Sequence, residues 1–269
     1  MELMTKVALK PSEQPITYND RILMVGSCFS DEVARKLGEH YFRVEANPFG
    51  TLYNPVSILH HLTDEVLSRY SVVFVTFGTA WVYIDRATNE VVDNCQKRPA
   101  TDFIRKRLSV DEILAAWRPL VQQHSEQRFI FTVSPIRHVK DGLHENELSK
   151  AILLLAVEQI INHHSQVTNC QYFPSYELLM DELRDYRFYA EDLKHPSGQA
   201  VNYIFERFAE TYLYTPETKQ TMSELHALWL DRHHRLLNPD SPEAEAFIER
   251  TNSKFSELSK RYPWLSEHK

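Results

Sequence analysis

Glycine and cysteine are scarce in this chain, and each scarcity excludes a class of protein. With 6 Gly in 269 residues, the sequence has no glycine-rich loop of the kind that cradles a nucleotide phosphate, so we expect no cofactor. Its 3 Cys are odd in number and never form a Cys-x-x-Cys pair, which argues against a disulfide framework and against a metal site. This cysteine usage is typical of a reducing compartment, and we predict a cytoplasmic protein.

Excess positive charge and long apolar runs are lacking as well. The 30 Lys and Arg are outnumbered by 37 Asp and Glu, which gives a formal net charge of −7. Because there is also no basic tract, the sequence argues against nucleic acid as a partner. No stretch of about 18 apolar residues is present, so we expect no transmembrane helix and no membrane partner. The first residues do not follow the pattern of a secretory signal.

The sequence instead alternates short apolar runs with longer amphipathic stretches. Buried strands are predicted at 22–25, 41–45, 72–77, 129–133 and 170–173, and helices at 31–41, 54–67, 109–124, 145–163, 175–183 and 197–214. Strands that alternate with helices form a parallel sheet covered on both faces. We therefore predict an α/β fold with three layers, α/β/α, and an antiparallel hairpin at 81–92 that projects from it.

The composition changes after residue 215. Residues 217–269 are highly charged and helix-forming, contain no strand pattern, and are interrupted by prolines at 238–242. We therefore predict one α/β domain at 1–215 and a helical C-terminal extension at 216–269 that packs on it. Formation of a homo-oligomer through these helices is an open possibility.

The first predicted strand ends at Gly26, and a helix follows almost at once. Such a turn places a small nucleophilic side chain at the top of a sheet, beside backbone N–H groups and the positive end of a helix dipole. Ser27 and Cys28 both occupy this position. The alternative is a structural turn in which Ser30 caps the helix and Cys28 fills the core.

A second informative stretch precedes the helix at 197–214. Asp192 and His195 are spaced so that the carboxylate can orient the imidazole, as a nucleophile and its base require. The alternative is an ordinary surface pair. Arg137 and His138 follow the end of a predicted strand, where ligands bind in parallel sheets, and they either contact an acidic substrate or pair with Asp141.

Taken together, these stretches resemble the GSCFA family of the SGNH, or GDSL-like, hydrolase superfamily. The matching motifs are Gly26-Ser27-Cys28-Phe29-Ser30, Asn47-Pro48-Phe49-Gly50-Thr51, Gly78-Thr79-Ala80-Trp81, Asn94-Cys95 to Pro99, Ser134-Pro135-Ile136-Arg137-His138, Tyr172 to Glu177, and Asp192-x-x-His195-Pro196-Ser197. The resemblance spans about residues 20–215 and implies an α/β/α fold with a five-stranded parallel sheet.

The resemblance also implies roles for single residues. Cys28 takes the position of the nucleophile and Ser27 the position of the preceding Asp, so Cys28 is the first candidate nucleophile and Ser27 the second. His195 is the implied base, and Asp192 orients it. From its place at a helix N-terminus, we expect the Cys28 thiol to have a pKa below the usual value and to be the most reactive of the three thiols.

The oxyanion donors follow the family pattern only in part. The Cys28 N–H and Gly50 match two of the implied donors. In the third block, which begins at Gly78, Ala80 stands where the superfamily has Asn, so one donor is missing. The candidates to replace it are the Thr79 hydroxyl, Asn47 and His138.

These features predict an SGNH-type hydrolase or acyltransferase that acts on a small-molecule or carbohydrate ester, with a small O-acyl group. The alternative is a non-catalytic binding or assembly module that kept the fold, with the charged helices as its partner surface. Three features carry less weight. The adjacent histidines at 60–61, 163–164 and 233–234 are poor metal sites because helical neighbours face apart. The aromatic residues Tyr186, Phe188 and Tyr189 either line a pocket or pack against the sheet edge, and packing is the expectation. Cys170 is expected to fill the core.

Overall fold

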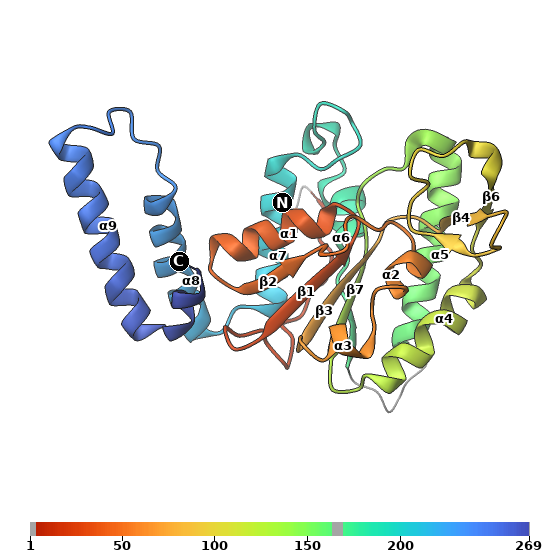
Figure 1. Cartoon of the computed structure of the whole chain (residues 1–269), viewed down its shortest axis with the longest axis horizontal. Helices are drawn as coiled ribbons and strands as arrows, with labels where there is room; N and C mark the ends of the chain where they lie inside the picture. Colours follow the sequence, from red (N-terminus) through yellow and green to blue (C-terminus); the bar gives the residue numbers. More distant parts are fainter. Residues whose placement is uncertain (1–3, 163–168, 269) are drawn as a thin grey trace.

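A five-stranded parallel sheet lies at the centre of the molecule (Figure 1). The computed structural model describes residues 4–162 and 169–268. The sheet has the order β2-β1-β3-β7-β8, and its strands are β1 (Arg21–Gly26), β2 (Arg43–Ala46), β3 (Val72–Phe77), β7 (Arg128–Val133) and β8 (Cys170–Tyr172). Every neighbouring pair is parallel, which confirms the predicted fold class. The order reverses between β1 and β3, where such sheets bind ligands.

Side chains of each strand alternate between two hydrophobic clusters, one on each face of the sheet. Phe74 of β3 belongs to one cluster and Val75 to the other. The first face is covered by α1 (Phe29–Glu39) and α7 (Gly198–Tyr212), and the second by α2 (Pro55–Leu59), α3 (Asp64–Leu67), α4 (Val110–Gln123) and α5 (Leu143–Asn162). The predicted helix at 54–67 is therefore two helices, because Thr63 caps a new one with its side chain.

The long helix α5 has no single apolar face. Leu155, for example, has 56% of its surface exposed. Apolar residues lie all around this helix, so periodicity alone does not identify its inner face. The buried positions are Asn146, Ser149, Lys150, Leu153, Ala156, Val157 and Ile160. A lysine therefore lies on the inner face of α5.

A small antiparallel sheet projects from the end of β3. It has the order β5-β4-β6 and consists of β4 (Trp81–Asp85), β5 (Val91–Val92) and β6 (Phe103–Arg107), the last preceded by the turn η1 (Ala100–Asp102). The predicted hairpin corresponds to β4 and β5. β6 was not predicted because its sequence is mostly charged and exposed. In Figure 1 this sheet lies beside α5, at the end of the molecule away from the C-terminal helices.

Several connecting segments between β7 and α7 are irregular, although α5 and β8 lie among them. The turn η2 (Val139–Asp141) precedes α5, and after β8 the short helix α6 (Ser175–Glu177) continues as a π-helical turn, η3 (Leu178–Leu183), where one α-helix was expected. The turn η4 (Tyr186–Phe188) leads into the loop that holds Asp192 and His195.

The C-terminal extension consists of α8 (Pro216–Arg232), α9 (Pro242–Arg261) and the turn η5 (Pro263–His268). Met222, Leu225 and Leu228 of α8 join the hydrophobic cluster of α1 and α7. Only Ala244 and Thr251 are buried on α9, which lies farthest from the sheet in Figure 1. The extension thus packs on the sheet domain, while the exact domain boundary stays a prediction. None of the described helices combines the length and hydrophobicity needed to cross a bilayer.

Candidate active site

The turn after β1 begins with a close approach of two backbones. Gly26 has a φ of +128°, and a Cβ placed on it would lie 2.1 Å from the carbonyl oxygen of Thr76 in β3. Only glycine fits such a position. The next residue, Ser27, is fully buried, and its Oγ accepts a hydrogen bond from the Phe29 N–H at 3.3 Å. Ser27 therefore points into the protein, whereas the Cys28 side chain is partly exposed and faces His195.

Cys28 takes part in a hydrogen-bonded series of three side chains. Its Sγ lies 3.5 Å from Nε2 of His195, and Nδ1 of the same imidazole lies 2.6 Å from Oδ2 of Asp192. Cys28 stands at the N-terminal end of α1, whereas the other two residues come from the loop before α7. A thiol, an imidazole and a carboxylate in this order can move a proton from the sulfur to the imidazole.

The loop holds this series through its own backbone. Oδ1 of Asp192 accepts hydrogen bonds from the N–H groups of Lys194, at 2.9 Å, and His195, at 3.0 Å. These bonds turn the chain tightly, with Leu193 in the left-handed region at a φ of 57°. The hydrogen bonds from the backbone and the side chain of His195 lower the pKa of Asp192. The carboxylate therefore remains charged and fixes the imidazole that it contacts.

The expected low pKa of the Cys28 thiol is wrong. Burial raises its pKa above the usual value, and the nearby Asp31 carboxylate raises it further. Asp31 belongs to the first turn of α1, so the helix that offers its dipole also brings negative charge. The thiol is accordingly neutral at pH 7, and a base must remove its proton during reaction.

Asn47 and Gly50 brace this turn from the side of β2. Asn47 accepts the Gly26 N–H at 2.9 Å and donates to Asp31 at 3.0 Å. The Gly50 N–H donates to the Asn47 carbonyl oxygen at 2.8 Å. Both groups that were expected to stabilise an oxyanion are thus engaged in hydrogen bonds within the protein.

The block that begins at Gly78 is also occupied by internal hydrogen bonds. The N–H groups of Gly78 and Thr79 both donate to the Tyr53 carbonyl oxygen at 2.8 Å. The Thr79 hydroxyl lies 3.1 Å from the Ser149 hydroxyl, which in turn accepts the Ala80 N–H at 2.8 Å. Thr79 therefore anchors the start of β4 to α5.

His138 also lies close to Gly78. Its Nε2 would be 3.2 Å from a Cβ placed on Gly78, and its ring meets the edge of the Tyr53 ring, with centroids 5.5 Å apart. Its backbone N–H donates to Asn146 at 2.9 Å. Burial lowers the pKa of this imidazole to about 3, with a further contribution from Lys150, so His138 is neutral.

Lys150 was not singled out from the sequence. Its side chain is buried to 1% exposure, and its ammonium donates to the carbonyl oxygens of Gly78 and Ser134, both at 2.7 Å. Burial lowers its pKa to about 7. Through these two hydrogen bonds, Lys150 holds the ends of β3 and β7 together. These strand ends lie next to the turn formed by Gly26, Ser27 and Cys28, which we call the nucleophile turn. No local pattern in the sequence reveals Lys150, because apolar residues surround α5 and hide its inner face.

A cavity of about 420 Å³ lies between the small sheet and the loops at the ends of β3 and β7. Its lining combines aromatic, amide and cationic side chains, among them Tyr53, Asn54, Trp81, Tyr83, Asn94, Arg105, Arg137, His138, Lys140 and Lys194. Cys95 reaches it as well. Cys28, Asp192 and His195 do not line this cavity themselves, but Lys194, the neighbour of His195 in the sequence, does.

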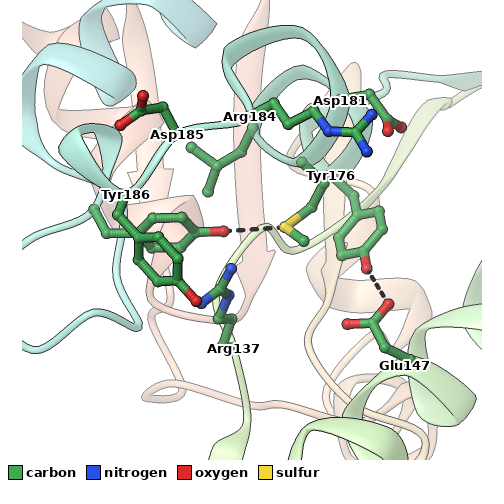
Figure 2. Close-up of a pocket in the computed structure, with 10 residues that line it drawn as sticks. Arg137, Glu147, Tyr176, Asp181, Arg184, Asp185 and Tyr186 are labelled. Carbon is green, nitrogen blue, oxygen red and sulfur yellow. Dashed lines mark hydrogen bonds between the residues drawn. The ribbon is translucent and has the colours of Figure 1, made fainter.

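A second cavity, of about 450 Å³, lies between η3 and the loop before Asp192 (Figure 2). Arg137 contributes to both cavities, and here its guanidinium lies 4.2 Å from the ring centre of Tyr189 and 5.1 Å from that of Tyr186. Tyr186 and Tyr189 therefore line a pocket, while Tyr189 and Phe188 also pack in the hydrophobic cluster of α1 and α7, so both interpretations hold in part. The side chain of Asp141, the alternative partner of Arg137, lies outside the described structure.

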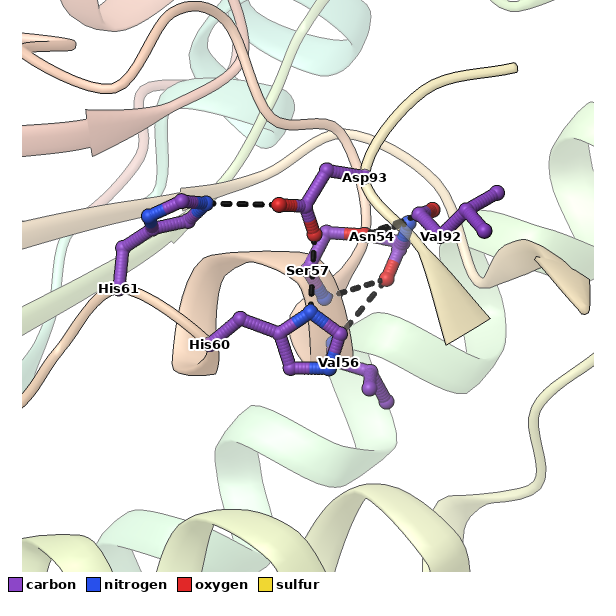
Figure 3. A network of polar contacts seen from close by, with 7 residues as sticks. All are labelled: Asn54, Val56, Ser57, His60, His61, Val92 and Asp93. Carbon is purple, nitrogen blue, oxygen red and sulfur yellow. Dashed lines mark hydrogen bonds and ion pairs between the residues drawn. The ribbon is translucent and has the colours of Figure 1, made fainter. Parts of the chain in front are cut away.

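Two adjacent histidines share the carboxylate of Asp93, a residue that also lines the first cavity (Figure 3). His60 and His61 contact the two oxygens of Asp93 at 2.9 and 2.7 Å. The expectation that neighbours face apart fails here because α2 ends at His60. No cluster of three or more His, Cys, Asp or Glu in the described residues is suited to a metal ion. The pair at 163–164 lies outside the described residues.

Solved structures similar to this chain include a GDSL-like lipase from Bacteroides thetaiotaomicron, with 13% identity, a TM-score of 0.46, and coverage of 79% of this chain and 92% of that one. A lipolytic G-D-S-L family protein from Veillonella parvula has 12% identity, a TM-score of 0.42, and coverage of 71% and 96%. A carbohydrate esterase family 3 protein from Talaromyces cellulolyticus has 10% identity, a TM-score of 0.38, and coverage of 76% and 98%.

No curated protein sequence matches the chain significantly. The sequence model of one family does match, over residues 21–70 and 61–208. The matched residues include every strand of the central sheet, both segments of the thiol–imidazole–carboxylate series, and most of α7. The protein belongs to the GSCFA family.

Proposed function

We propose that this protein is an SGNH-type hydrolase or acyltransferase that acts on an ester, with Cys28 as the nucleophile. The observation that carries the proposal is the hydrogen-bonded series of Cys28, His195 and Asp192, with distances of 3.5 and 2.6 Å. Ser27 is the second candidate nucleophile, but its buried Oγ accepts a bond from Phe29, and His195 contacts the neighbouring thiol instead.

The reaction begins with a neutral thiol. As the Cys28 sulfur attacks the ester carbonyl carbon, His195 takes the thiol proton, and Asp192 stabilises the imidazolium that forms. The carbonyl oxygen becomes an oxyanion held by the Cys28 N–H. The intermediate then collapses, the alcohol leaves with the proton from His195, and an acyl thioester remains on Cys28.

The second half of the reaction releases the acyl group. His195 takes a proton from water or from an acceptor alcohol, whose oxygen attacks the thioester carbonyl. Collapse of this intermediate returns the proton to the Cys28 sulfur and frees the acid or the new ester. Hydrolysis and acyl transfer differ only in the molecule that occupies the acceptor position.

The first cavity fits a polar alcohol portion. Aromatic faces and amide groups are the side chains that bind sugar rings and their hydroxyl groups, and the cavity offers Tyr53, Trp81 and Asn94. Its cationic residues suit a substrate with an acidic group. A small O-acyl group on a carbohydrate or similar polar molecule is therefore the proposed substrate.

The test is to trap the acyl group on the protein. The purified chain is incubated with p-nitrophenyl acetate and with a panel of acetylated sugars, and its peptides are analysed by mass spectrometry. We expect an acetyl mass on the peptide that contains Cys28, with no such mass in Cys28→Ala. Cys95→Ala is the matched control, since it removes another cavity thiol, and it should acylate like the wild type.

Other outcomes would redirect the proposal. Equal turnover by wild type and Cys28→Ala would remove Cys28 from the mechanism, and loss of activity in Ser27→Ala alone would favour Ser27. The alternative, a binding or assembly module, is supported by the missing Asn at Ala80. It would be favoured if the folded wild type neither forms an acyl intermediate nor hydrolyses any ester of the panel.

A further inference from the structure

One buried polar atom beside the nucleophile turn has no partner. Nε2 of His138 is inaccessible to solvent and makes no hydrogen bond within the described part of the chain. Buried polar groups are nearly always paired, so an orphan calls for a ligand, a water molecule or a functional role. The same side chain also lines the first cavity.

The position of this atom relates it to the reacting centre. A Cβ placed on Gly78 would lie 3.2 Å from Nε2 of His138 and 3.4 Å from the Cβ of Ser27. The His138 imidazole and the turn that carries Ser27 therefore lie close to the same glycine, at which a side chain would contact both. Cys28 directly follows Ser27 in this turn, so His138 Nε2 lies near the backbone that carries the thiol.

The other candidates for the missing oxyanion donor are occupied. The Thr79 hydroxyl pairs with Ser149, and both functional ends of the Asn47 amide are engaged, one with Gly26 and one with Asp31. Of these three candidate side chains, only that of His138 keeps a polar atom, Nε2, without a hydrogen-bond partner in the described structure.

We propose that His138, through an N–H at Nε2, is the second oxyanion donor and replaces the Asn that is missing at Ala80. This inference rests on the proposed function, because it assigns a group to the same acyl transfer. A neutral imidazole is an established kind of electrophilic donor to a carbonyl that gains negative charge.

The surroundings of His138 suit this role. Burial, together with the Lys150 ammonium, lowers the pKa of His138 to about 3, so this imidazole does not compete with His195 for the thiol proton. Lys150 is a positioning residue in this scheme. It contacts the carbonyl oxygens of Gly78 and Ser134 and thereby fixes the strand end against which His138 lies. The two histidines of the site are thus separated into a base and a donor.

The experiment compares two reactions of the same sulfur. Acylation of Cys28 by p-nitrophenyl acetate passes through an oxyanion, whereas alkylation by iodoacetamide does not. Both rates are measured for the wild type, His138→Ala, His138→Phe and His138→Gln, with His144→Ala as the control for an exposed histidine on α5. His138→Phe keeps the ring against Tyr53 if the Ala variant folds poorly.

We expect His138→Ala and His138→Phe to acylate about 100- to 1000-fold more slowly, while their alkylation rates stay within about threefold of the wild-type rate. His138→Gln, which carries an amide N–H, should recover at least about tenfold over the Phe variant. Equal losses in both reactions, or acylation at the wild-type rate, would overturn the role of His138 alone. A wild type that is alkylated but never acylated would overturn the proposed function, and this inference with it.

Discussion

His195 Nε2 lies 3.5 Å from Cys28 Sγ although 167 residues separate the two in the sequence. The thiol stands at the end of β1, and the imidazole stands in the loop before α7, which packs against α1 on the same face of the sheet. The contact therefore depends on the packing of α7 against α1. Substitutions in the loop before α7 test the role of the imidazole, and substitutions near Cys28 test the reactivity of the thiol.

Asp192→Asn should slow acylation of Cys28 without unfolding the protein. The amide can still accept the turn hydrogen bonds, but it no longer stabilises the imidazolium, and we expect a loss of about 100- to 10,000-fold in kcat. Asp185→Asn is the matched control, because Asp185 accepts the Arg187 N–H in the same way without contacting a histidine. Comparable losses in both variants would indicate a structural role for Asp192.

Asp31→Asn should make Cys28 more reactive near neutral pH. The Asp31 carboxylate raises the pKa of the thiol, so its removal lowers that pKa and increases the thiolate fraction below it. We expect iodoacetamide to alkylate Cys28 about three- to tenfold faster at pH 8, with the pH–rate curve displaced to lower pH. Asp111→Asn, in the first turn of α4, should leave the curve unchanged. A curve that does not move would exclude Asp31 as a cause.

Gly26→Ala and Gly38→Ala should change stability in opposite directions. At Gly26 the new methyl group would lie 2.1 Å from a β3 carbonyl oxygen at a φ of +128°, and we expect a loss of at least about 3 kcal/mol. At Gly38, within α1, no atom beyond the surrounding backbone of the helix lies within 4 Å of the added Cβ, and a gain of about 0.5–1 kcal/mol is expected. Urea unfolding of both variants measures this, and a stable Gly26→Ala would show that the turn can relax.

The carboxylate shared by His60 and His61 should contribute stability that depends on pH. Burial raises the pKa of Asp93, but hydrogen bonds from His61 and His60 outweigh it, and the net pKa is lowered. A lowered pKa gives stability that is present above the usual carboxyl value of about 4 and is lost as the pH falls through the folded value. Asp93→Asn should therefore be less stable than the wild type at pH 7, with a difference that shrinks towards pH 3.

Asp64→Asn is the control for this effect, because Asp64 also contacts a histidine, His124, but is 77% exposed. Exposed pairs contribute little, so its unfolding midpoint in urea should follow that of the wild type at every pH. A difference for Asp93→Asn that is the same at pH 7 and pH 3 would exclude the carboxylate charge as its source.

The central fold could be predicted because its signals are local. Short sequence patterns predict its elements. Apolar runs indicate the strands β1, β3 and β7, and the capping side chains of Asn54 and Ser109 indicate where two helices begin. β6 gave no such signal, since its sequence, Phe-Ile-Arg-Lys-Arg, pairs with β4 at an exposed edge. The inner face of α5 was hidden for the opposite reason, because apolar residues surround the helix.

The sequence motifs indicated which residues form the candidate site. They did not indicate the orientation, the pKa or the hydrogen-bond partners of these residues. The motifs indicated Cys28 and His195, but which of Ser27 and Cys28 faces the imidazole depends on the turn at Gly26. The pKa of Cys28 was expected below its usual value because the helix dipole was considered without burial, the largest cause of the rise, and without the carboxylates of Asp31 and Glu32. The partners of Asn47 and Thr79 come from other elements, which no local pattern reveals.

Because the ammonium of Lys150 is buried, its reaction with an acetylating reagent can measure how often the sheet domain opens. Amine-acetylating reagents require an accessible, unprotonated nitrogen, and this one is enclosed with two carbonyl oxygens as acceptors. Reaching it requires separation of α5 from the ends of β3 and β7, which also dismantles the surroundings of Gly78. Acetylation of Lys150 therefore reports opening of the sheet domain itself, whereas exposed lysines such as Lys140 report only their own accessibility.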